Sequence, residues 1–288
     1  MPGRPVPGAQ RMIQLPDPGE FWNRHAARED DREQRSLVKR VHTDLVWREI
    51  ETRLEGIKTV LDVGAGTGRF SIPLARKGLD VVHFDLSNEM IKIAETKALG
   101  ENLVNIQFQQ GTILDLSAYN NRQYDLVLCL DAPISFSYPH QIEVIKELIR
   151  ITQKTLILSV ACRLGNLPTW IDGDLLIAGK WKTVWKIWQD GLFQADEEVV
   201  SLHPTIIPGM YFFTPTEIRT LLEESGARVI NLCAPAGLAR LLKIEALEKL
   251  ISIPKMYQEF LTLEQEYDRE VLIGIDTAGN LLITACLE

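Results

Sequence analysis

Three glycines at alternate positions, Gly64, Gly66 and Gly68, follow a short apolar run, Val60–Val63. Glycine lets a backbone approach a ligand closely and adopt conformations that other residues avoid. A loop of this kind at the carboxyl end of a parallel strand lies where open α/β sheets bind their ligands. A dinucleotide fingerprint needs glycine at the sixth place of the loop, and that place holds Arg69. The spacing therefore predicts a ligand loop that does not fit a dinucleotide.

Two acidic residues stand beside this loop. Asp62 precedes the glycines by two positions, and Asp85 ends the next apolar run, Val81–Phe84. A carboxylate at that strand end can accept hydrogen bonds from both hydroxyls of a ribose. The alternative is an ordinary residue at the start of a helix, and the glycine loop upstream favours the ribose role for Asp85.

The acidic strand end followed by GxGxG resembles the first motif of class I S-adenosylmethionine-dependent methyltransferases. The segment Phe212–Ile218, with the Leu221–Leu222 pair and the Ser225–Ala227 turn behind it, is similar to a late helix of their small-molecule branch. That branch, methyltransferase type 11, includes the quinone-biosynthesis enzymes. The resemblance covers about residues 20–233 and is specific for the cofactor, not for the substrate.

The resemblance implies that S-adenosylmethionine is the cofactor, and it assigns the residues around it. Gly111–Ile113 would contact the adenine ring, and Leu130–Pro133 would lie beside the methyl group. Phe21 and Trp22 fall where relatives have an aromatic entry helix. The cofactor residues so implied are Phe21, Trp22, Asp62, Gly64, Ala65, Gly66, Thr67, Gly68, Asp85, Leu86, Met90, Gly111, Thr112, Ile113, Leu130, Asp131 and Ala132.

Three features depart from the family pattern. Thr112 stands where an acidic residue is common, so adenine recognition would use its hydroxyl and the backbone. The stretch between Cys233 and Leu281 is longer than the usual hairpin, which predicts extra helices. Asp131–Ile134 reads Asp-Ala-Pro-Ile, which differs from the motif of enzymes that methylate amino groups on nucleic-acid bases or glutamine.

Methyl transfer needs a general base only if the nucleophile holds its proton tightly. The candidates are His140, His203 and Asp131. For each histidine the alternative is a surface or hydrogen-bonding role, and the sequence does not separate the candidates.

The acceptor site is expected over the strand ends, from residues 163–214, the helices of 238–272 and the N-terminal segment. Trp170 and Tyr211 are the predicted substrate contacts. Trp181, Trp185 and Trp188 recur at helical spacing and fit either a lid or a core helix. The aromatic content suits a small apolar or aromatic molecule, although Arg163, Lys180, Lys182 and Lys186 could serve an anionic acceptor.

Apolar runs alternate with amphipathic segments from residue 58, which indicates right-handed βαβ units in a parallel sheet. By resemblance we expect a Rossmann-like α/β fold with seven strands in the order 3-2-1-4-5-7-6. The last strand, Leu281–Leu287, would be antiparallel. Residues 1–19 would be a mobile tail, and 20–288 a single domain with helical cap insertions at 20–55, 163–214 and 238–272.

Composition narrows the function classes. A hydrophobic content of 45% supports a full core, and a net charge of -8 does not favour nucleic acid. No apolar stretch is long enough to span a bilayer, and the Pro/Gly-rich start is not a signal peptide, so we expect a cytoplasmic protein. The cysteine spacing matches no metal site, and the four thiols are expected to be buried and reduced.

Two other functions remain open at this point. One is a methyltransferase acting on RNA or protein, which would need a basic or peptide-sized groove. The other is a non-catalytic S-adenosylmethionine-binding protein of the same fold. The oligomeric state is left undetermined.

Overall fold

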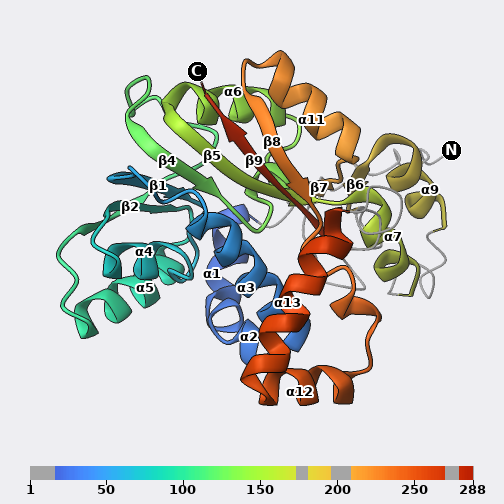
Figure 1. The fold of residues 1–288 in the computed structure, drawn as a ribbon. Coiled ribbons are helices and arrows are strands. Elements are labelled where there is room, and N and C mark those ends of the chain that lie inside the picture. Colours follow the sequence, from blue (N-terminus) through green and yellow to red (C-terminus); the bar gives the residue numbers. More distant parts are fainter. Residues whose placement is uncertain (1–16, 173–180, 196–208, 270–278, 288) are drawn as a thin grey trace, which may run out of the picture.

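The structure is a computed structural model that describes residues 17–172, 181–195, 209–269 and 279–287 (Figure 1). Its centre is a seven-stranded sheet in the order β3-β2-β1-β4-β5-β9-β8. The strands are β1 (Thr59–Val63), β2 (Asp80–Asp85), β3 (Ile106–Gln110), β4 (Tyr124–Cys129), β5 (Thr152–Ala161), β8 (Arg228–Cys233) and β9 (Asn280–Cys286). The central strands β1 and β4 are buried along nearly their whole length, as their continuous apolar runs require.

Strand direction follows the expected pattern. β9 is antiparallel to both β5 and β8, and the other neighbouring strands of the sheet pair in parallel. β6 (Leu192–Gln194) and β7 (Gly209–Tyr211) form a separate two-stranded sheet, so β8 and β9 are the sixth and seventh strands of the main one. The predicted order 3-2-1-4-5-7-6 with an antiparallel last strand is confirmed.

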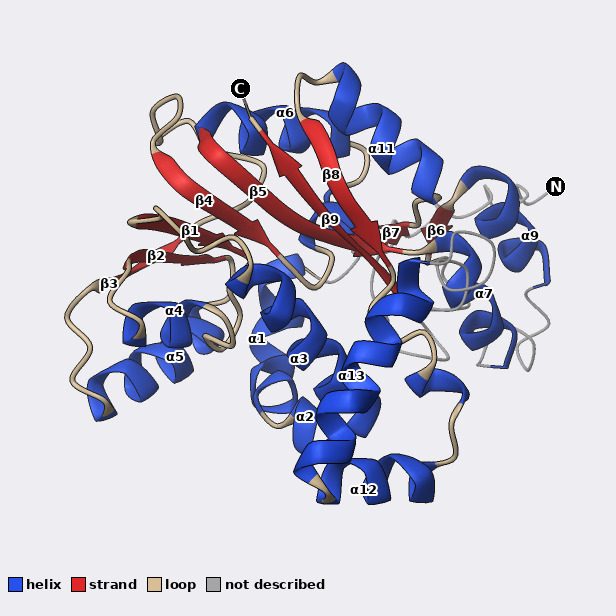
Figure 2. Cartoon of the chain, in the orientation of Figure 1, coloured by secondary structure: helices blue, strands red, loops and turns tan. Residues whose placement is uncertain are grey.

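Helices cover both faces of the sheet (Figure 2). One face carries α3 (Leu37–Glu51), α4 (Ser71–Arg76) and α5 (Asn88–Gly100), and the other carries α6 (Gln141–Ile151) and α11 (Pro215–Glu224). Each helix buries an apolar stripe against the strands. On α6 the stripe is Val144, Ile145, Leu148 and Ile151, at the three- and four-residue spacing of a helix face.

Side-chain caps mark the starts of α5 and α11. The Ser87 hydroxyl accepts a hydrogen bond from the Met90 amide at 3.2 Å and begins α5 directly after β2. Thr214, rather than Thr216, caps α11, and it forms a capping box with Glu217. These caps fix where each helix begins relative to the strand ends.

The N-terminal helices lie beside the carboxyl ends of the strands. They are α1 (Pro18–Asp30), capped by Asp17, and α2 (Arg32–Arg35). α1 begins at Pro18, two residues before the boundary that the sequence predicts. No helix among the described residues is long and apolar enough to cross a lipid bilayer.

The extra helices expected after Cys233 are α12 (Ile244–Ser252) and α13 (Pro254–Arg269). They pack against α3 in a separate apolar cluster, where Tyr257 and Phe260 meet Leu45. The Tyr257 hydroxyl donates to Asp44 at 2.6 Å. These helices therefore lie against α3, beside the N-terminal part of the chain (Figure 1).

Candidate active site

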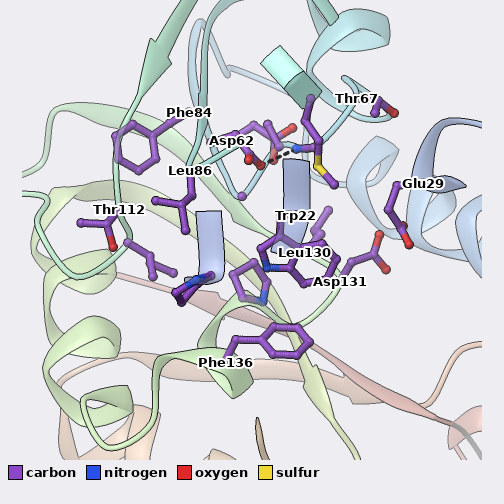
Figure 3. Close-up of a pocket in the computed structure, with 18 of the residues that line it drawn as sticks. Trp22, Glu29, Asp62, Thr67, Phe84, Leu86, Thr112, Leu130, Asp131 and Phe136 are labelled. Atoms are coloured by element: carbon purple, nitrogen blue, oxygen red, sulfur yellow. Dashed lines mark hydrogen bonds between the residues drawn. The ribbon is translucent and has the colours of Figure 1, made fainter. Parts of the chain in front are cut away.

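A cavity of about 260 Å³ lies at the carboxyl ends of β1, β2 and β4, next to α1. Figure 3 shows the side chains that face it, from Phe84 and Thr112 at one end to Glu29 and Asp131 at the other. Its walls combine apolar rings with four carboxylates and two guanidinium groups. The carboxylates are Glu29, Asp62, Asp85 and Asp131, and the guanidiniums are Arg32 and Arg69.

The three glycines of the loop serve different purposes. All have left-handed backbones, with φ of 73° at Gly64, 58° at Gly66 and 86° at Gly68. A Cβ at Gly64 would lie 2.6 Å from Pro133, and one at Gly68 would lie 2.5 Å from Ile72, so both glycines are also required by packing. A Cβ at Gly66 would meet no atom closer than the Met90 sulfur at 3.7 Å. Gly66 therefore leaves room that belongs to the cavity.

Asp85 is held rigidly at the end of β2. Its Oδ2 accepts the Gly66 amide at 2.8 Å, and its Oδ1 accepts the Ser87 amide at 2.7 Å. Burial nevertheless raises the pKa of this carboxyl above its usual value. Each oxygen keeps a further lone pair, so Asp85 can accept two hydroxyl groups from a ligand in the cavity.

Asp62 is the most enclosed of the cavity carboxylates. Burial, together with the nearby charge of Asp85, raises the pKa of Asp62 to about 8. Its Oδ2 is a buried acceptor without a partner. Arg32 contributes the complementary feature, a buried Nε–H without a partner. The Asp62 carboxyl and the Arg32 guanidinium both belong to residues that line the cavity, and this pair of groups suits a zwitterionic amino-acid group, such as the methionine end of S-adenosylmethionine.

The far end of the cavity is apolar. Phe84, Leu86 and Leu114 line it together with Thr112 and Ile113. Gly111 lies against the Phe84 ring, where a Cβ would approach to 2.5 Å. This end is a flat apolar slot with one hydroxyl, which suits a planar heterocycle.

One aromatic residue of α1, Trp22, lines the cavity. Its ring meets the Phe136 ring edge-on, with centroids 5.3 Å apart. Phe21 points elsewhere, stacking on His25 at 4.2 Å. Asn23 ties the helix to the start of α5 by accepting a hydrogen bond from the Ser87 hydroxyl at 2.7 Å. The entry helix expected from Phe21 and Trp22 is present, with Trp22 facing the cavity.

Asp131 lies at the centre of a charge network after β4. Arg32 donates to its Oδ2 at 2.8 Å and Arg69 at 2.5 Å. Arg32 also pairs with Glu29, and Arg69 with Glu33, each at 3.0 Å. Burial alone would raise the pKa of Asp131, but the two guanidinium groups hold it well below its usual range.

This carboxylate is therefore a counter-ion for two arginines and a poor proton acceptor at neutral pH. Its backbone is left-handed, with φ of 62°, and so is that of Ala132, with φ of 71°. Such conformations are uncommon for residues with side chains and concentrate at functional sites. Here they turn the chain sharply from β4 into a 3-10 helix, η1 (Pro133–Ser137), which brings Pro133 and Phe136 to the cavity wall.

The cavity gathers most of the predicted cofactor residues. Those that do not line it are Phe21, Gly68 and Ala132. Ala132 is buried with the apolar residues on the other side of the turn. These three positions shape the site without facing it.

The predicted base and substrate residues are placed differently. His140 is exposed at the start of α6 and does not line the cavity. Tyr211 also lies outside it, with its ring parallel to that of Tyr138 and its hydroxyl 3.4 Å from Arg163. His203 and the Trp170 side chain lie outside the described residues.

The cavity also contains residues that the sequence does not predict, among them Glu29, Arg32, Arg69 and Phe136. Arg69 directly follows the glycines, but its position there only argues against a dinucleotide fingerprint. Glu29 and Arg32 belong to a charged segment with no distinguishing spacing. Phe136 follows the Asp-Ala-Pro-Ile motif, whose proline marks a turn at this place. Only the fold shows that these side chains meet.

Comparisons with known proteins agree with this geometry. Residues 60–155 match the family model described as a methyltransferase domain. The ubiquinone biosynthesis O-methyltransferase of Acinetobacter baumannii is 32% identical over 114 residues, 39% of this chain and 45% of that protein. The magnesium protoporphyrin IX methyltransferase of Arabidopsis thaliana is 34% identical over 124 residues, 43% of this chain and 39% of that protein. The matched segments thus span less than half the length of these relatives.

Solved structures extend the likeness to nearly the whole chain. A putative S-adenosylmethionine-dependent methyltransferase from Listeria monocytogenes covers 86% of this chain and 99% of its own, with a TM-score of 0.57 and 20% identity. At that identity the likeness concerns the fold. The seven-stranded sheet is thus shared with that structure, and residues 60–155, which include the glycine loop and Asp85, match the methyltransferase-domain model.

Proposed function

We propose that this protein transfers a methyl group from S-adenosylmethionine to a small, largely apolar or aromatic molecule by in-line displacement. The observation that carries the proposal is Asp85, fixed by two backbone amides at the end of β2 and facing the Gly66 side of the cavity. A carboxylate in this position, with free lone pairs, is suited to the two hydroxyls of a ribose.

The rest of the cavity fits the same cofactor. The Asp62 carboxyl and the Arg32 guanidinium, whose residues line the cavity, would lie near the amino and carboxylate groups of its methionine part. Phe84, Leu86 and Thr112 would enclose the adenine. Leu130 and Asp131, which follow β4, also line the cavity and would lie near the methyl group.

The cofactor supplies a methyl group already activated as a sulfonium. The protein would therefore contribute orientation and exclusion of water. Trp22, Phe136 and Leu130 form the apolar part of the wall on that side, where they would hold an acceptor dry and aligned.

A strong general base is not evident in the described part of the cavity. No histidine among the described residues lines it, and Asp131 is neutralised by two arginines. We infer an acceptor whose nucleophile gives up its proton readily or carries none, such as an acidic hydroxyl.

Two observations support this class of acceptor. The curated relatives are named for ubiquinone biosynthesis and for magnesium protoporphyrin IX, both of which concern small molecules. The net charge of -8 does not favour a polyanion. For the location we keep the cytoplasm as a proposal; of the four cysteines expected to be buried, Cys129 and Cys162 are buried, whereas Cys233 and Cys286 are partly exposed.

The decisive experiment incubates the protein with S-adenosylmethionine labelled in its methyl group and separate pools of metabolites, RNA and protein. Label should appear in the metabolite pool and not with the Asp85→Ala variant. Label in RNA or protein alone would replace the proposal with the corresponding macromolecular methyltransferase. Tight cofactor binding with no label in any pool would indicate a non-catalytic binding protein.

A further inference from the structure

One helix within residues 163–214, the segment expected to help form the acceptor site, carries tryptophans on the outside of the molecule. α9 (Trp181–Asp190) lies beside α7 (Arg163–Asp172) at the edge of the fold (Figure 2). Trp181, Trp185 and Trp188 are 46%, 50% and 48% exposed. Their spacing of four and three residues places them in one stripe along the helix.

The same helix is anchored by other residues. Val184 and Ile187 are buried and pack against Phe193 and Phe212. Of the two interpretations left open by the sequence, core packing is therefore wrong for the three tryptophans. Large apolar side chains gathered on a surface mark a place where something binds.

The charges next to the stripe indicate what binds. Lys182 and Lys186 are exposed on the same helix, and neither forms an ion pair with a described residue. Protein interfaces are enriched in tryptophan and arginine but depleted in lysine. Tryptophan combined with lysine is instead typical of helices that lie in the interface of a membrane with anionic lipids.

The position of α9 connects this surface to the candidate site. The cluster that holds Val184 and Ile187 also contains Ala132, and Phe136 packs against it. Phe136 lines the cavity and touches Trp22. The exposed stripe is thus separated from the cavity wall by the apolar cluster beneath α9.

We propose that α9 binds the surface of an anionic lipid membrane, with the rings of Trp181, Trp185 and Trp188 at the headgroup boundary and Lys182 and Lys186 facing lipid phosphates. The binding is peripheral and local, because charges elsewhere on this acidic protein are screened within about 10 Å at moderate salt. A protein held this way would receive an apolar acceptor directly from the lipid, a role that rests on the proposed methyl transfer.

The test is co-sedimentation of the full chain with vesicles. One set contains phosphatidylcholine alone, and the other contains phosphatidylcholine mixed with phosphatidylglycerol. We expect clear binding to the mixed vesicles and weak binding to the neutral ones, with the difference shrinking as salt is added.

Three multiple-substitution variants separate the contribution of the tryptophans from that of the lysines and provide a control. The triple variant Trp181→Ala, Trp185→Ala, Trp188→Ala should lose more than tenfold in binding to both kinds of vesicle. The double variant Lys182→Gln, Lys186→Gln should lose about fivefold per lysine on anionic vesicles only. The control is Leu99→Ala with Val104→Ala, which removes apolar side chains that are 78% and 94% exposed elsewhere and should change nothing.

Cofactor affinity and thermal unfolding are measured on every variant, and Trp185→Ala serves alone if the triple variant unfolds. Absence of wild-type binding to either vesicle overturns the proposal, as does full binding by a folded tryptophan variant. A wild-type dimer that the tryptophan variant converts to a monomer, without vesicle binding, would make the stripe a contact between two copies. Vesicle binding requires no turnover, so its failure is distinct from failure of the proposed function.

Discussion

The two sides of the cavity are held in place by different forces. On the strand side, at the ends of β1 and β2, Gly66 has a left-handed backbone and its amide donates a hydrogen bond to the Asp85 carboxylate. On the helical side, Arg32, Asp131 and Arg69 are fixed by ion pairs that join α2 and the glycine loop to the end of β4.

The difference matters for how each side responds to change. Hydrogen bonds from backbone amides to the Asp85 carboxylate join neighbouring strand ends over a short distance and depend little on salt. Ion pairs between distant segments depend on partial burial and on every partner staying in place. A substitution that alters the geometry of the strand side should therefore abolish cofactor binding. Substitutions on the helical side should instead weaken cofactor binding in smaller steps.

The largest effect is expected on the strand side from Gly66→Val. The side chain would enter the cavity from a backbone with φ of 58°, so calorimetry should detect no binding of S-adenosylmethionine. Gly56→Val is the matched control, because Gly56 has φ of 71° and no atom within 4 Å of an added Cβ. Equal loss of binding in both variants would attribute the effect to backbone strain rather than to the cavity.

Asp85→Ala should weaken cofactor binding by about 1.5–3 kcal/mol, the range for hydrogen bonds to a charged group. That is roughly a 10- to 150-fold rise in Kd. Asp80→Ala, at the exposed start of the same strand, should leave Kd unchanged. An unaltered Kd in Asp85→Ala would remove the ribose assignment.

On the helical side, Asp131→Asn tests whether this residue positions the arginines or acts as the base. As a counter-ion, its loss should raise the cofactor Kd about tenfold and lower stability by about 2 kcal/mol. Glu33→Gln removes a more exposed partner of Arg69 and should have a smaller effect on both. A turnover rate that falls by about two orders of magnitude while Kd stays normal would instead indicate a base.

The smallest effect on binding is expected for Asp62→Asn, which should raise Kd about fivefold by removing a partner of the ligand's ammonium. The same substitution should make the folded protein more stable at neutral pH, although it weakens cofactor binding. The folded pKa of Asp62 is raised to about 8, so the wild type loses stability as pH rises from about 4 to about 8.

The variant escapes that loss because asparagine does not ionise. Its melting temperature should equal the wild-type value near pH 4 and exceed it increasingly as the pH rises to 8. Thermal unfolding across this range measures the difference. A constant difference at every pH would show that folding does not raise the pKa of Asp62.

The strand side could be predicted because its information is local. The alternation of strands and helices indicates the sheet, and Asp85 reaches the loop because adjacent parallel strands end at the same edge. Ser87 and Thr214 are identifiable as caps because a cap acts on the next few residues. Each of these features depends on residues close in sequence or on a regular fold.

The helical side could not be predicted in the same way. Arg32 and Asp131 are 99 positions apart and meet only because α2 packs over the end of β4. Helices α12 and α13 were expected near the acceptor, yet none of their described residues lines the cavity; they bury their apolar faces against α3.

The sequence by itself determined the fold class, the glycine loop, the strand that presents Asp85 and the cofactor that these imply. The tertiary structure decided that Asp131 is neutralised by Arg32 and Arg69, that Tyr211 turns away from the cavity, and that the tryptophans of α9 face outward. The physical reason is that periodicity and turn chemistry act over a few residues. Charge pairing and burial depend instead on which distant surfaces the folded chain brings together.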